Sequence, residues 1–167
     1  EANYGKNTFS RIKGDYGTSD YLTKRVIKGV PYIGFGLGAQ SFGNSYLAYN
    51  EGARTKGLSE YFEKIDNNEF PLQDIYDLPL EESIAKMVSV AFYFGFVDFK
   101  AFKERFNEDF DKHFKDEIKF LKDKGLVIVK DNKMIITEKG TENMGGIIPM
   151  FYSKQSQNEL FKLKKIF

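Results

Sequence analysis

The stretch "LKDKGLVIVKDNKMIITEKG", residues 121–140, contains the clearest structural pattern of the chain. Gly125 follows a segment of helical apolar periodicity, and glycine is common immediately after a helix. Two runs rich in β-branched residues come next, at 126–129 and 134–137, separated by four polar residues. Because two such runs joined by a short polar turn are typical of a β-hairpin, the stretch predicts a helix followed directly by a hairpin.

The sequence on both sides of this hairpin is helical. Aromatic and aliphatic residues recur at spacings of three and four, and Asp98 is placed to cap one helix. The predicted helices span about 80–94, 98–106, 110–124 and, interrupted by Gly145, Gly146 and Pro149, 141–152. Three helices followed by a hairpin are the order of a winged helix, so residues 71–167 are predicted to form a winged-helix-like C-terminal domain.

A second distinctive stretch is "YIGFGLGAQSFG", residues 32–43, with Gly34, Gly36 and Gly38 at alternate positions. Glycine weakens a strand, so such a run is expected where another backbone or a ligand comes close. We therefore predict a strand end or turn that is pressed against a neighbour.

The remainder of the N-terminal region is less regular. "YLTKRVIKG" (21–29) predicts a short helix that ends at its glycine. Residues 57–70 predict an amphipathic helix with Ser59 as its N-cap, and Pro71 follows it. We place a domain boundary there, which gives an α+β protein with a first domain at 1–70 and a second at 71–167.

Composition excludes several classes of site. The 167 residues have a formal net charge of +1, which favours neither nucleic acid nor an acidic membrane. Cysteine is absent, so this chain holds no disulfide, thiolate zinc site or cysteine-bound cluster. No apolar run reaches the roughly 18 residues of a membrane span. These features fit a cytoplasmic protein, and a first residue other than Met suggests a piece of a longer one.

A winged helix raises the hypothesis of DNA binding, because its third helix commonly enters the major groove. Here that helix reads "DFDKHFKDEIKFLKDKG" (109–125), in which acidic residues balance the lysines and arginine is absent. Phosphate contacts need uncompensated cations, and guanine is read mainly by arginine. We therefore expect no nucleic-acid partner, and a packing role for this fold.

Two further sequence features give little support for a functional site. His113 is the single histidine, and no metal-ligating partner stands at a suitable spacing, so it is interpreted as a surface residue. "GFGLGA" (34–39) departs from the dinucleotide-binding fingerprint in the position of its third glycine. Neither a metal ligand nor a catalytic residue is assigned from the sequence.

The order of several segments is more informative than any one of them. "YIGFGLGAQSFG" is followed by "YLAYNEG", "LSEYFEKI", "LPLEE" and then the hairpin stretch. This series resembles the C-terminal part of the oxygen-independent coproporphyrinogen III oxidase (dehydrogenase) family, which are radical S-adenosylmethionine enzymes of haem biosynthesis. The resemblance runs from about residue 32 to residue 152, and the glycine run is its most specific part.

The resemblance implies a fold and an activity for a longer parent protein. Residues 1–70 would be the last segment of a (β/α) radical S-adenosylmethionine barrel, followed by the helical domain with its wing. The parent would bind S-adenosylmethionine and a 4Fe–4S cluster on a CxxxCxxC loop, and would oxidatively decarboxylate propionate side chains of a tetrapyrrole. This chain lacks that loop, so alone it would hold no cofactor and be inactive. Without the rest of the barrel, it is expected to self-associate through residues 32–42, or else to be disordered before about residue 30.

The same resemblance places Gly36, Gly38, Ala39 and Gln40 near the cofactor, with Tyr49 and Asn50 as further candidates. In this interpretation the glycines let the barrel backbone approach a bound nucleoside or porphyrin. Tight packing between strand and helix is the alternative explanation for the same glycines, and the sequence leaves both open.

Two departures from the family pattern bear on the substrate. Many members have histidine where this chain has Gln40, and many have a His-Asn…Tyr-Trp stretch before the glycine run that is missing here. The second motif belongs to haem-chaperone relatives, so its absence argues against a chaperone. Two alternatives stay open: a paralogue acting on haem or another tetrapyrrole, and a winged-helix binding or regulatory module without catalysis.

Overall fold

A computed structural model describes residues 20–163 of the chain. Contacts divide these residues into two units. Unit 2 is Pro31–Ser83, and unit 1 comprises residues 20–30 and 84–163. The predicted domain boundary at 70/71 therefore falls inside unit 2, whereas the contacts separate the units at 30/31 and 83/84. A boundary at 70/71 stays a prediction.

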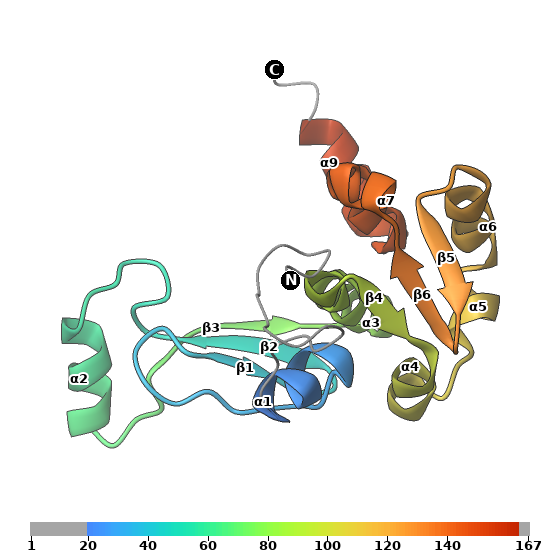
Figure 1. Ribbon diagram of the computed structural model, residues 1–167. Coiled ribbons are helices and arrows are strands. Elements are labelled where there is room, and N and C mark those ends of the chain that lie inside the picture. Colours follow the sequence, from blue (N-terminus) through green and yellow to red (C-terminus); the bar gives the residue numbers. More distant parts are fainter. Residues whose placement is uncertain (1–19, 164–167) are drawn as a thin grey trace. The chain divides into compact units, whose positions relative to one another are not determined.

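Unit 2 is built on a three-stranded antiparallel sheet in the order β1-β2-β3. Its strands are Gln40–Phe42, Tyr46–Asn50 and Leu72–Asp77. Helix α2 (Ser59–Asp66) lies in the connection from β2 to β3, at one end of the sheet (Figure 1). The glycine run enters the sheet through an isolated bridge between Tyr32 and Phe42. The predicted strand end or turn is thus present, and β2 and β3 were not predicted.

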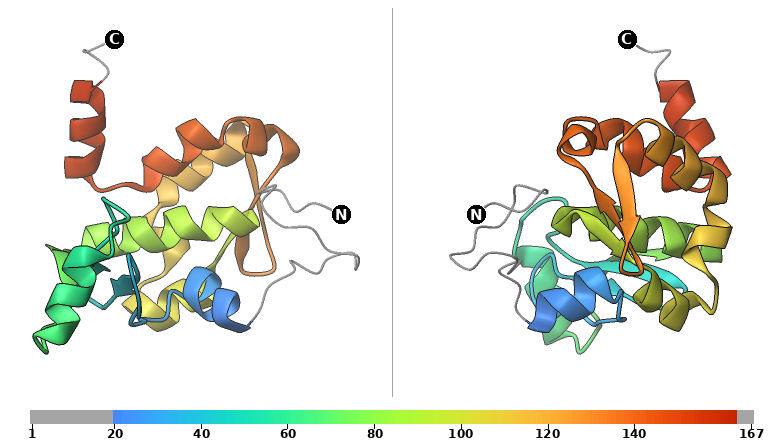
Figure 2. Two further views of the ribbon diagram at one scale, coloured as in Figure 1. Left: turned by 90° about the vertical axis from the view of Figure 1, so that its left-hand side faces the viewer. Right: turned by 45° about the vertical axis from the view of Figure 1, so that its right-hand side comes forward.

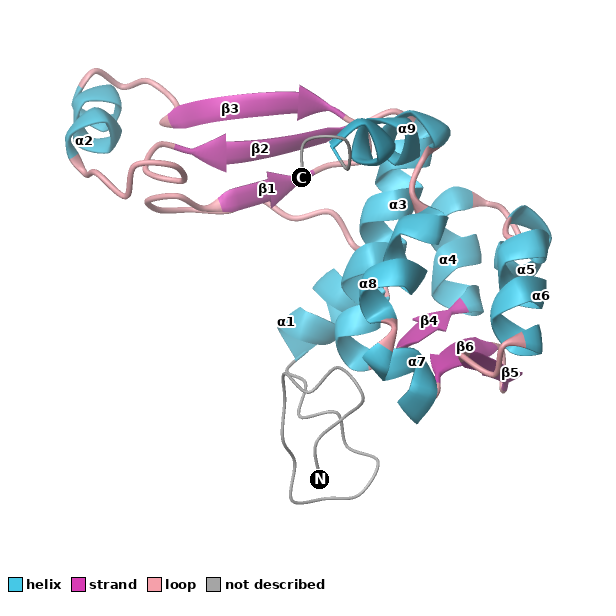
Figure 3. Cartoon of the chain, turned by 90° about the horizontal axis from the view of Figure 1, so that it is seen from above, coloured by secondary structure: helices cyan, strands magenta, loops and turns pink. Residues whose placement is uncertain are grey.

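Unit 1 is mainly helical, with a second small sheet (Figure 3). Its helices up to the hairpin are α1 (Asp20–Leu22), the π-helical turn η1 (Thr23–Ile27), α3 (Leu80–Ala91, whose first four residues fall in unit 2), the 3₁₀ turn η2 (Phe92–Phe94), α4 (Phe99–Phe106), α5 (Phe110–His113) and α6 (Lys115–Asp123). After the hairpin come α7 (Glu138–Glu142), α8 (Met144–Ile147), the 3₁₀ turn η3 (Ile148–Phe151) and α9 (Lys154–Leu163).

The predicted hairpin is present as β5 (Val127–Lys130) and β6 (Lys133–Ile136), drawn in orange in Figure 2. Asp131 and Asn132 form its two-residue turn and both have positive φ, at 52° and 56°. Two such residues suit the right-handed twist of a hairpin, and Asp and Asn tolerate this conformation. A third strand, β4 (Phe96–Asp98), pairs with β6, and its three residues gave no strand signal in the sequence.

An aromatic cluster forms the centre of unit 1. Phe102 contacts Phe106, Phe110 and Phe114, with ring centroids 4.9, 5.1 and 6.4 Å away. Phe151, from the far side of the hairpin, packs on Phe110 and Phe114 at 6.0 and 5.0 Å. Because α4, α5, the residue between α5 and α6, and η3 each supply a buried ring, the cluster joins the helices before the hairpin to those after it.

Several predicted details need correction. The N-cap of α2 is Leu58 rather than Ser59, and it makes no side-chain capping bond. The predicted helix at 110–124 is two helices, because the backbone of Phe114 leaves the helical region at φ −112° and ψ 38°. Asp98 does cap α4, since its carboxylate accepts from the Ala101 amide at 2.9 Å. The mixed α and β composition is confirmed, while the barrel segment and the winged-helix arrangement stay predictions.

Candidate functional site

The glycine-rich loop, residues 33–38, is held by two buried polar side chains of unit 2. The Gly34 amide donates to Oγ of Ser41 in β1 at 3.0 Å. Asn50, at the end of β2, donates through Nδ2 to the carbonyl oxygens of Gly34 and Gly36, at 3.4 and 2.9 Å. Ser41 and Asn50 are both buried. The loop conformation therefore depends on polar contacts to the sheet.

Glycine is needed at the three alternating positions for different structural reasons. A Cβ on Gly34 would lie 2.3 Å from the Gln40 carbonyl oxygen, so this glycine permits close packing of two backbones. Gly38 has φ +64°, and a Cβ there would lie 3.3 Å from the Gly52 carbonyl. Gly36 has φ +103°, but a Cβ would meet no described atom within 4 Å. Packing thus accounts for Gly34, conformation for Gly36, and both for Gly38.

Two side chains next to these glycines are largely exposed, whereas Leu37, between Gly36 and Gly38, lies against Gly52. Phe35 is 89% exposed and Ile33 is 68% exposed, although both are large and apolar. Gly36 sits beside Phe35 in open space. The loop therefore presents an apolar edge on a backbone that Ser41 and Asn50 hold in place.

Gln40 joins two tyrosines on one face of the sheet. The Tyr32 hydroxyl donates to Gln40 Oε1, and Gln40 Nε2 donates to the Tyr49 hydroxyl at 2.6 Å. Gln40 and Tyr49 are direct partners in the β1–β2 register. The Tyr49 ring in turn meets the Tyr76 ring edge-on, with centroids 6.5 Å apart. The row of side chains crosses all three strands of the sheet.

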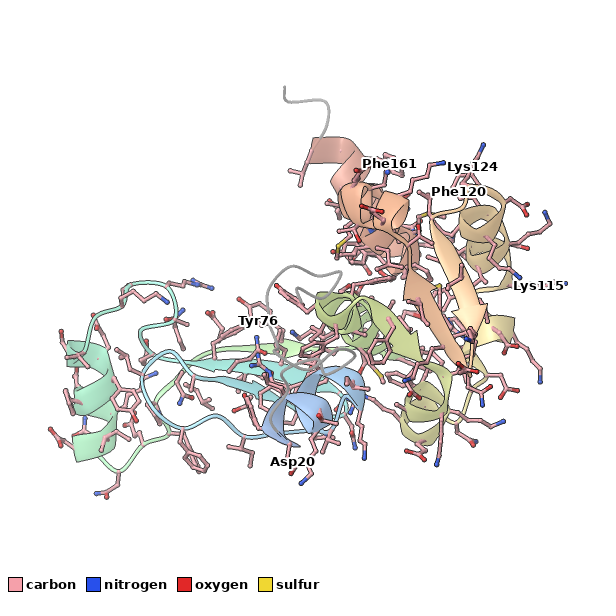
Figure 4. The ribbon with its side chains drawn as sticks, viewed as in Figure 1. Asp20, Tyr76, Lys115, Phe120, Lys124 and Phe161 are labelled. Atoms are coloured by element: carbon pink, nitrogen blue, oxygen red, sulfur yellow. The ribbon has the colours of Figure 1, made fainter. Side chains whose placement is uncertain are left out.

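Arg54 extends this row from the loop after β2. Its Nη2 donates to Asp74 Oδ1 at 2.7 Å and to the Tyr76 hydroxyl at 3.3 Å. The hydrogen bond to Tyr76 is the largest cause that raises the pKa of Arg54, and the Asp74 carboxylate raises it further. The guanidinium therefore stays protonated, and its exposed side chain is positioned by two β3 residues. Figure 4 labels Tyr76 in β3.

The structure brings together only part of the predicted site. Gln40 and Tyr49 are hydrogen-bonded to each other, whereas Asn50 contacts the loop backbone at Gly36. Gly38 ends the loop and Ala39 connects it to β1, and the Ala39 carbonyl accepts from the Asn50 amide at 2.9 Å. A cofactor-binding role for Gly36, Gly38, Ala39 and Gln40 stays a prediction.

Sequence reasoning missed three members of the row. Tyr32 was quoted only as the start of the glycine run, and Arg54 and Tyr76 were not considered. Arg54 and Tyr76 are 22 residues apart and meet only through the fold. A usable signal was the alternation of β3, which places Asp74 and Tyr76 on one face of a strand.

Several charged side chains of unit 1 form ion pairs with one another. Asp109 accepts from Lys103 at 2.5 Å and from Lys112 at 2.6 Å, and these bonds, first Lys103 and then Lys112, lower its pKa to about 2. His113 Nδ1 lies 2.5 Å from Glu108 Oε2. Within residues 20–163, no group of three His, Asp or Glu residues could hold a metal ion. In the same range, no helix combines the length and apolar character needed to cross a bilayer.

Unit 1 also has a groove of about 600 Å³ at the contact of α6, α8 and α9. Met150, Leu160 and Phe161 supply apolar walls, and Phe161 is labelled in Figure 4. The open floor consists partly of Gly145 and Gly146, where an added Cβ would meet no described atom within 4 Å. None of the residues predicted as a site lines this groove.

Comparison with known proteins agrees with the resemblance seen in the sequence. Residues 96–141 match the family model of the HemN C-terminal domain. This part of the chain is therefore similar to the HemN C-terminal domain. The matched residues begin at β4 and end within α7, so they contain the β4-β6-β5 sheet and helices α4, α5 and α6.

The solved structure of coproporphyrinogen III oxidase (HemN) from Escherichia coli, described as a radical SAM enzyme, has a similar fold. It aligns with a TM-score of 0.52 and 22% sequence identity over 74% of this chain. The alignment covers 29% of the HemN chain, so the likeness concerns less than a third of that enzyme. A search of curated proteins finds no match.

Proposed function

We propose that this chain is the C-terminal part of a radical S-adenosylmethionine enzyme resembling coproporphyrinogen III oxidase. The HemN C-terminal domain match at 96–141 carries the proposal, and the fold similarity to HemN supports it. In the parent protein, the region up to residue 70 is the last segment of the barrel and residues 71–167 are the winged-helix-like domain. The reaction is the oxidative decarboxylation of propionate side chains, in the cytoplasm.

The residues of this chain do not fit an iron–sulfur cluster. Such clusters are held by cysteine thiolates, and the sequence contains no cysteine. No alternative group of three His, Asp or Glu side chains converges in the described residues. The cluster therefore belongs to another part of the parent protein, and the chain alone is inactive.

The role proposed for this chain is to cover the pocket for cofactor and substrate. The loop backbone is fixed by Ser41 and Asn50, so its open side at Gly36 is a preformed surface. Such a surface excludes water from a reactive intermediate without having to be ordered on binding. Gly36, Gly38, Ala39 and Gln40 are its proposed contacts with the cofactor.

We propose no nucleic-acid partner for unit 1. Lys103, Lys112 and Lys119 each form an ion pair with an aspartate, and paired lysines release few counterions from DNA. A salt-sensitive shift of duplex DNA by this chain would instead favour a regulatory winged-helix module.

The deciding experiment uses the full reading frame from which the chain comes. We expect a CxxxCxxC sequence some hundreds of residues before Tyr32, and reductive cleavage of S-adenosylmethionine by the anaerobically reconstituted protein. Replacing those cysteines with alanine should abolish the cleavage and the absorbance of the cluster together. A reading frame without that cysteine sequence contradicts the proposal.

A further inference from the structure

Two phenol groups on the unit 2 sheet accept hydrogen bonds that leave their own protons unused. The Tyr49 hydroxyl accepts from Gln40, whose Oε1 is already occupied by Tyr32. The Tyr76 hydroxyl accepts from Arg54. Among residues 20–163, neither phenol proton has an acceptor. Because a hydroxyl donates as well as accepts, both groups can donate to a ligand oxygen.

Arg54 also has hydrogen-bond donors left over, because only one nitrogen of its guanidinium makes hydrogen bonds to the sheet. Both of its side-chain hydrogen bonds, to Asp74 and Tyr76, use Nη2. The N–H groups of Nη1 and Nε have no partner in the described part of the chain, and the side chain is 67% exposed. Asp74 is tied on its other oxygen by Gln73 Nε2 at 2.9 Å. Arg54 is thus oriented by β3 and presents its remaining donors outward.

These donors lie beside an aromatic surface. Tyr49 and Tyr76 meet edge to face, with ring centroids 6.5 Å apart. Charge-assisted hydrogen bonds from arginine to carboxylate are stronger than neutral ones, and arginine and tyrosine are both enriched among the residues that contribute most to protein interfaces. Unpaired donors at the edge of an aromatic surface suit an unsaturated or ring-shaped ligand that carries acidic groups.

We infer that Arg54, Tyr76 and Tyr49 form a carboxylate-binding site on this face of the unit 2 sheet. The inference rests on the proposed function in one respect: the ligand is taken to be a tetrapyrrole with propionate groups. S-adenosylmethionine also carries a carboxylate, so the shared chemistry is the carboxylate and the experiment separates the two sources. Arg54 and Tyr76 bind the carboxylate, and Tyr49 donates a further hydrogen bond.

The test measures binding to the full 167-residue chain. Coproporphyrin III, which carries propionate groups, is titrated by fluorescence, and its tetramethyl ester is titrated in parallel. S-adenosylmethionine is titrated by calorimetry. We expect the free acid to bind at least tenfold more tightly than the ester, and the difference to shrink as salt is raised. Equal affinity for acid and ester would overturn the inference.

Three variants locate the site. Arg54→Gln and Tyr76→Phe should each weaken binding of the acid about tenfold, and Tyr49→Phe about fivefold, without changing affinity for the ester. Tyr46→Phe is the matched control, because Tyr46 lies on the same strand with its side chain on the opposite face. Far-ultraviolet circular dichroism and melting temperature check that each variant is folded. Loss of acid binding in Tyr46→Phe alone would contradict the assignment.

The outcomes also separate the inference from the proposed function. If S-adenosylmethionine binds in an Arg54-dependent manner and the porphyrin acid does not, the carboxylate is that of the cofactor. If neither acid binds at millimolar concentration, the site is wrong, even where the full reading frame cleaves S-adenosylmethionine. Conversely, acid binding by this chain stands even if the reading frame lacks the cluster cysteines.

Discussion

The two units of this chain are stabilised in different ways. Unit 1 buries a continuous apolar core, in which Phe92, Phe102 and Phe110 are fully buried. Unit 2 buries few side chains, and three of those few, Ser41, Asn50 and Ser83, are polar. Large apolar residues of unit 2, such as Phe35 and Phe70, are 89% and 86% exposed. Burial of apolar surface dominates the first unit and specific hydrogen bonds dominate the second.

This difference indicates that unit 1 packs mainly against itself, whereas unit 2 has apolar surface available for contact with another molecule. A core of interlocking rings specifies its own structure, because each ring is covered by others. A thin sheet with exposed apolar side chains has surface still to bury, and exposed patches of this kind mark interaction sites. The proposed ligand surface and the predicted self-association both belong to unit 2.

The largest expected effect comes from truncating a ring in the core of unit 1. Phe102→Ala removes a fully buried side chain that contacts three other phenylalanine rings, and such changes cost about 3–5 kcal/mol of unfolding free energy. Phe35→Ala is the matched change in unit 2 and should leave stability almost unchanged, because the ring is already exposed. Urea denaturation followed by circular dichroism measures both. Equal losses would remove the contrast between the units.

A smaller effect is expected from Asn50→Ala in unit 2. The change leaves the Gly34 and Gly36 carbonyls without their side-chain donor, and a lost buried hydrogen bond costs about 1–3 kcal/mol. Faster hydrogen exchange should be confined to the glycine-rich loop and β1, as seen by mass spectrometry. Asn44→Ala is the control, because Asn44 is exposed in the β1–β2 connection. Uniformly faster exchange throughout both units would show that the loop is coupled to the core.

Local patterns predicted most of unit 1. The hairpin, the Asp98 cap and the end of a helix at Gly125 each follow from a few adjacent residues. What the sequence missed depends on contacts between distant segments. Strand β4 is three residues long and exists because it pairs with β6, about 38 residues later. The kink at Phe114 likewise accompanies packing of its ring against Phe151.

The candidate site was less predictable for the same reason. Gln40 and Tyr49 could be selected because they lie close to the glycine run, and the register of β1 and β2 pairs them. Arg54 and Tyr76 join the row only because β3 pairs with β2, and no short sequence motif predicts that pairing. The glycine pattern is evident in the sequence. The structural reason for each glycine differs, however, and only the φ angles and the space around each position distinguish them.

A pair of glycine substitutions separates the effect of available space from the effect of a positive φ angle. Gly146, in α8, and Gly36, in the loop, both have open space where a Cβ would stand. Gly146→Ala should stabilise the chain by about 0.4–1 kcal/mol, because alanine restricts the unfolded chain and fits a helix. Gly36→Ala should destabilise by about 1 kcal/mol or more, because φ is +103°. The melting temperatures of both variants test this expectation. Loss of stability in both would mean that the groove lined by Gly146 does not tolerate a methyl group.

The smallest effect concerns the pH dependence of unit 1. Lys103 first, and then Lys112, hold the pKa of Asp109 at about 2, below its ordinary value of 3.8. The unfolded chain therefore binds a proton at this position before the folded chain does, so stability from Asp109 is complete above about pH 4 and is lost as pH falls toward 2. Asp109→Asn should flatten the pH dependence of the melting temperature in that window, and salt should reduce the wild-type slope, because the ion pairs are exposed. Asp66→Asn is the control, since Asp66 forms no ion pair within residues 20–163. An unchanged slope in Asp109→Asn would mean that other carboxylates set the acid sensitivity of the fold.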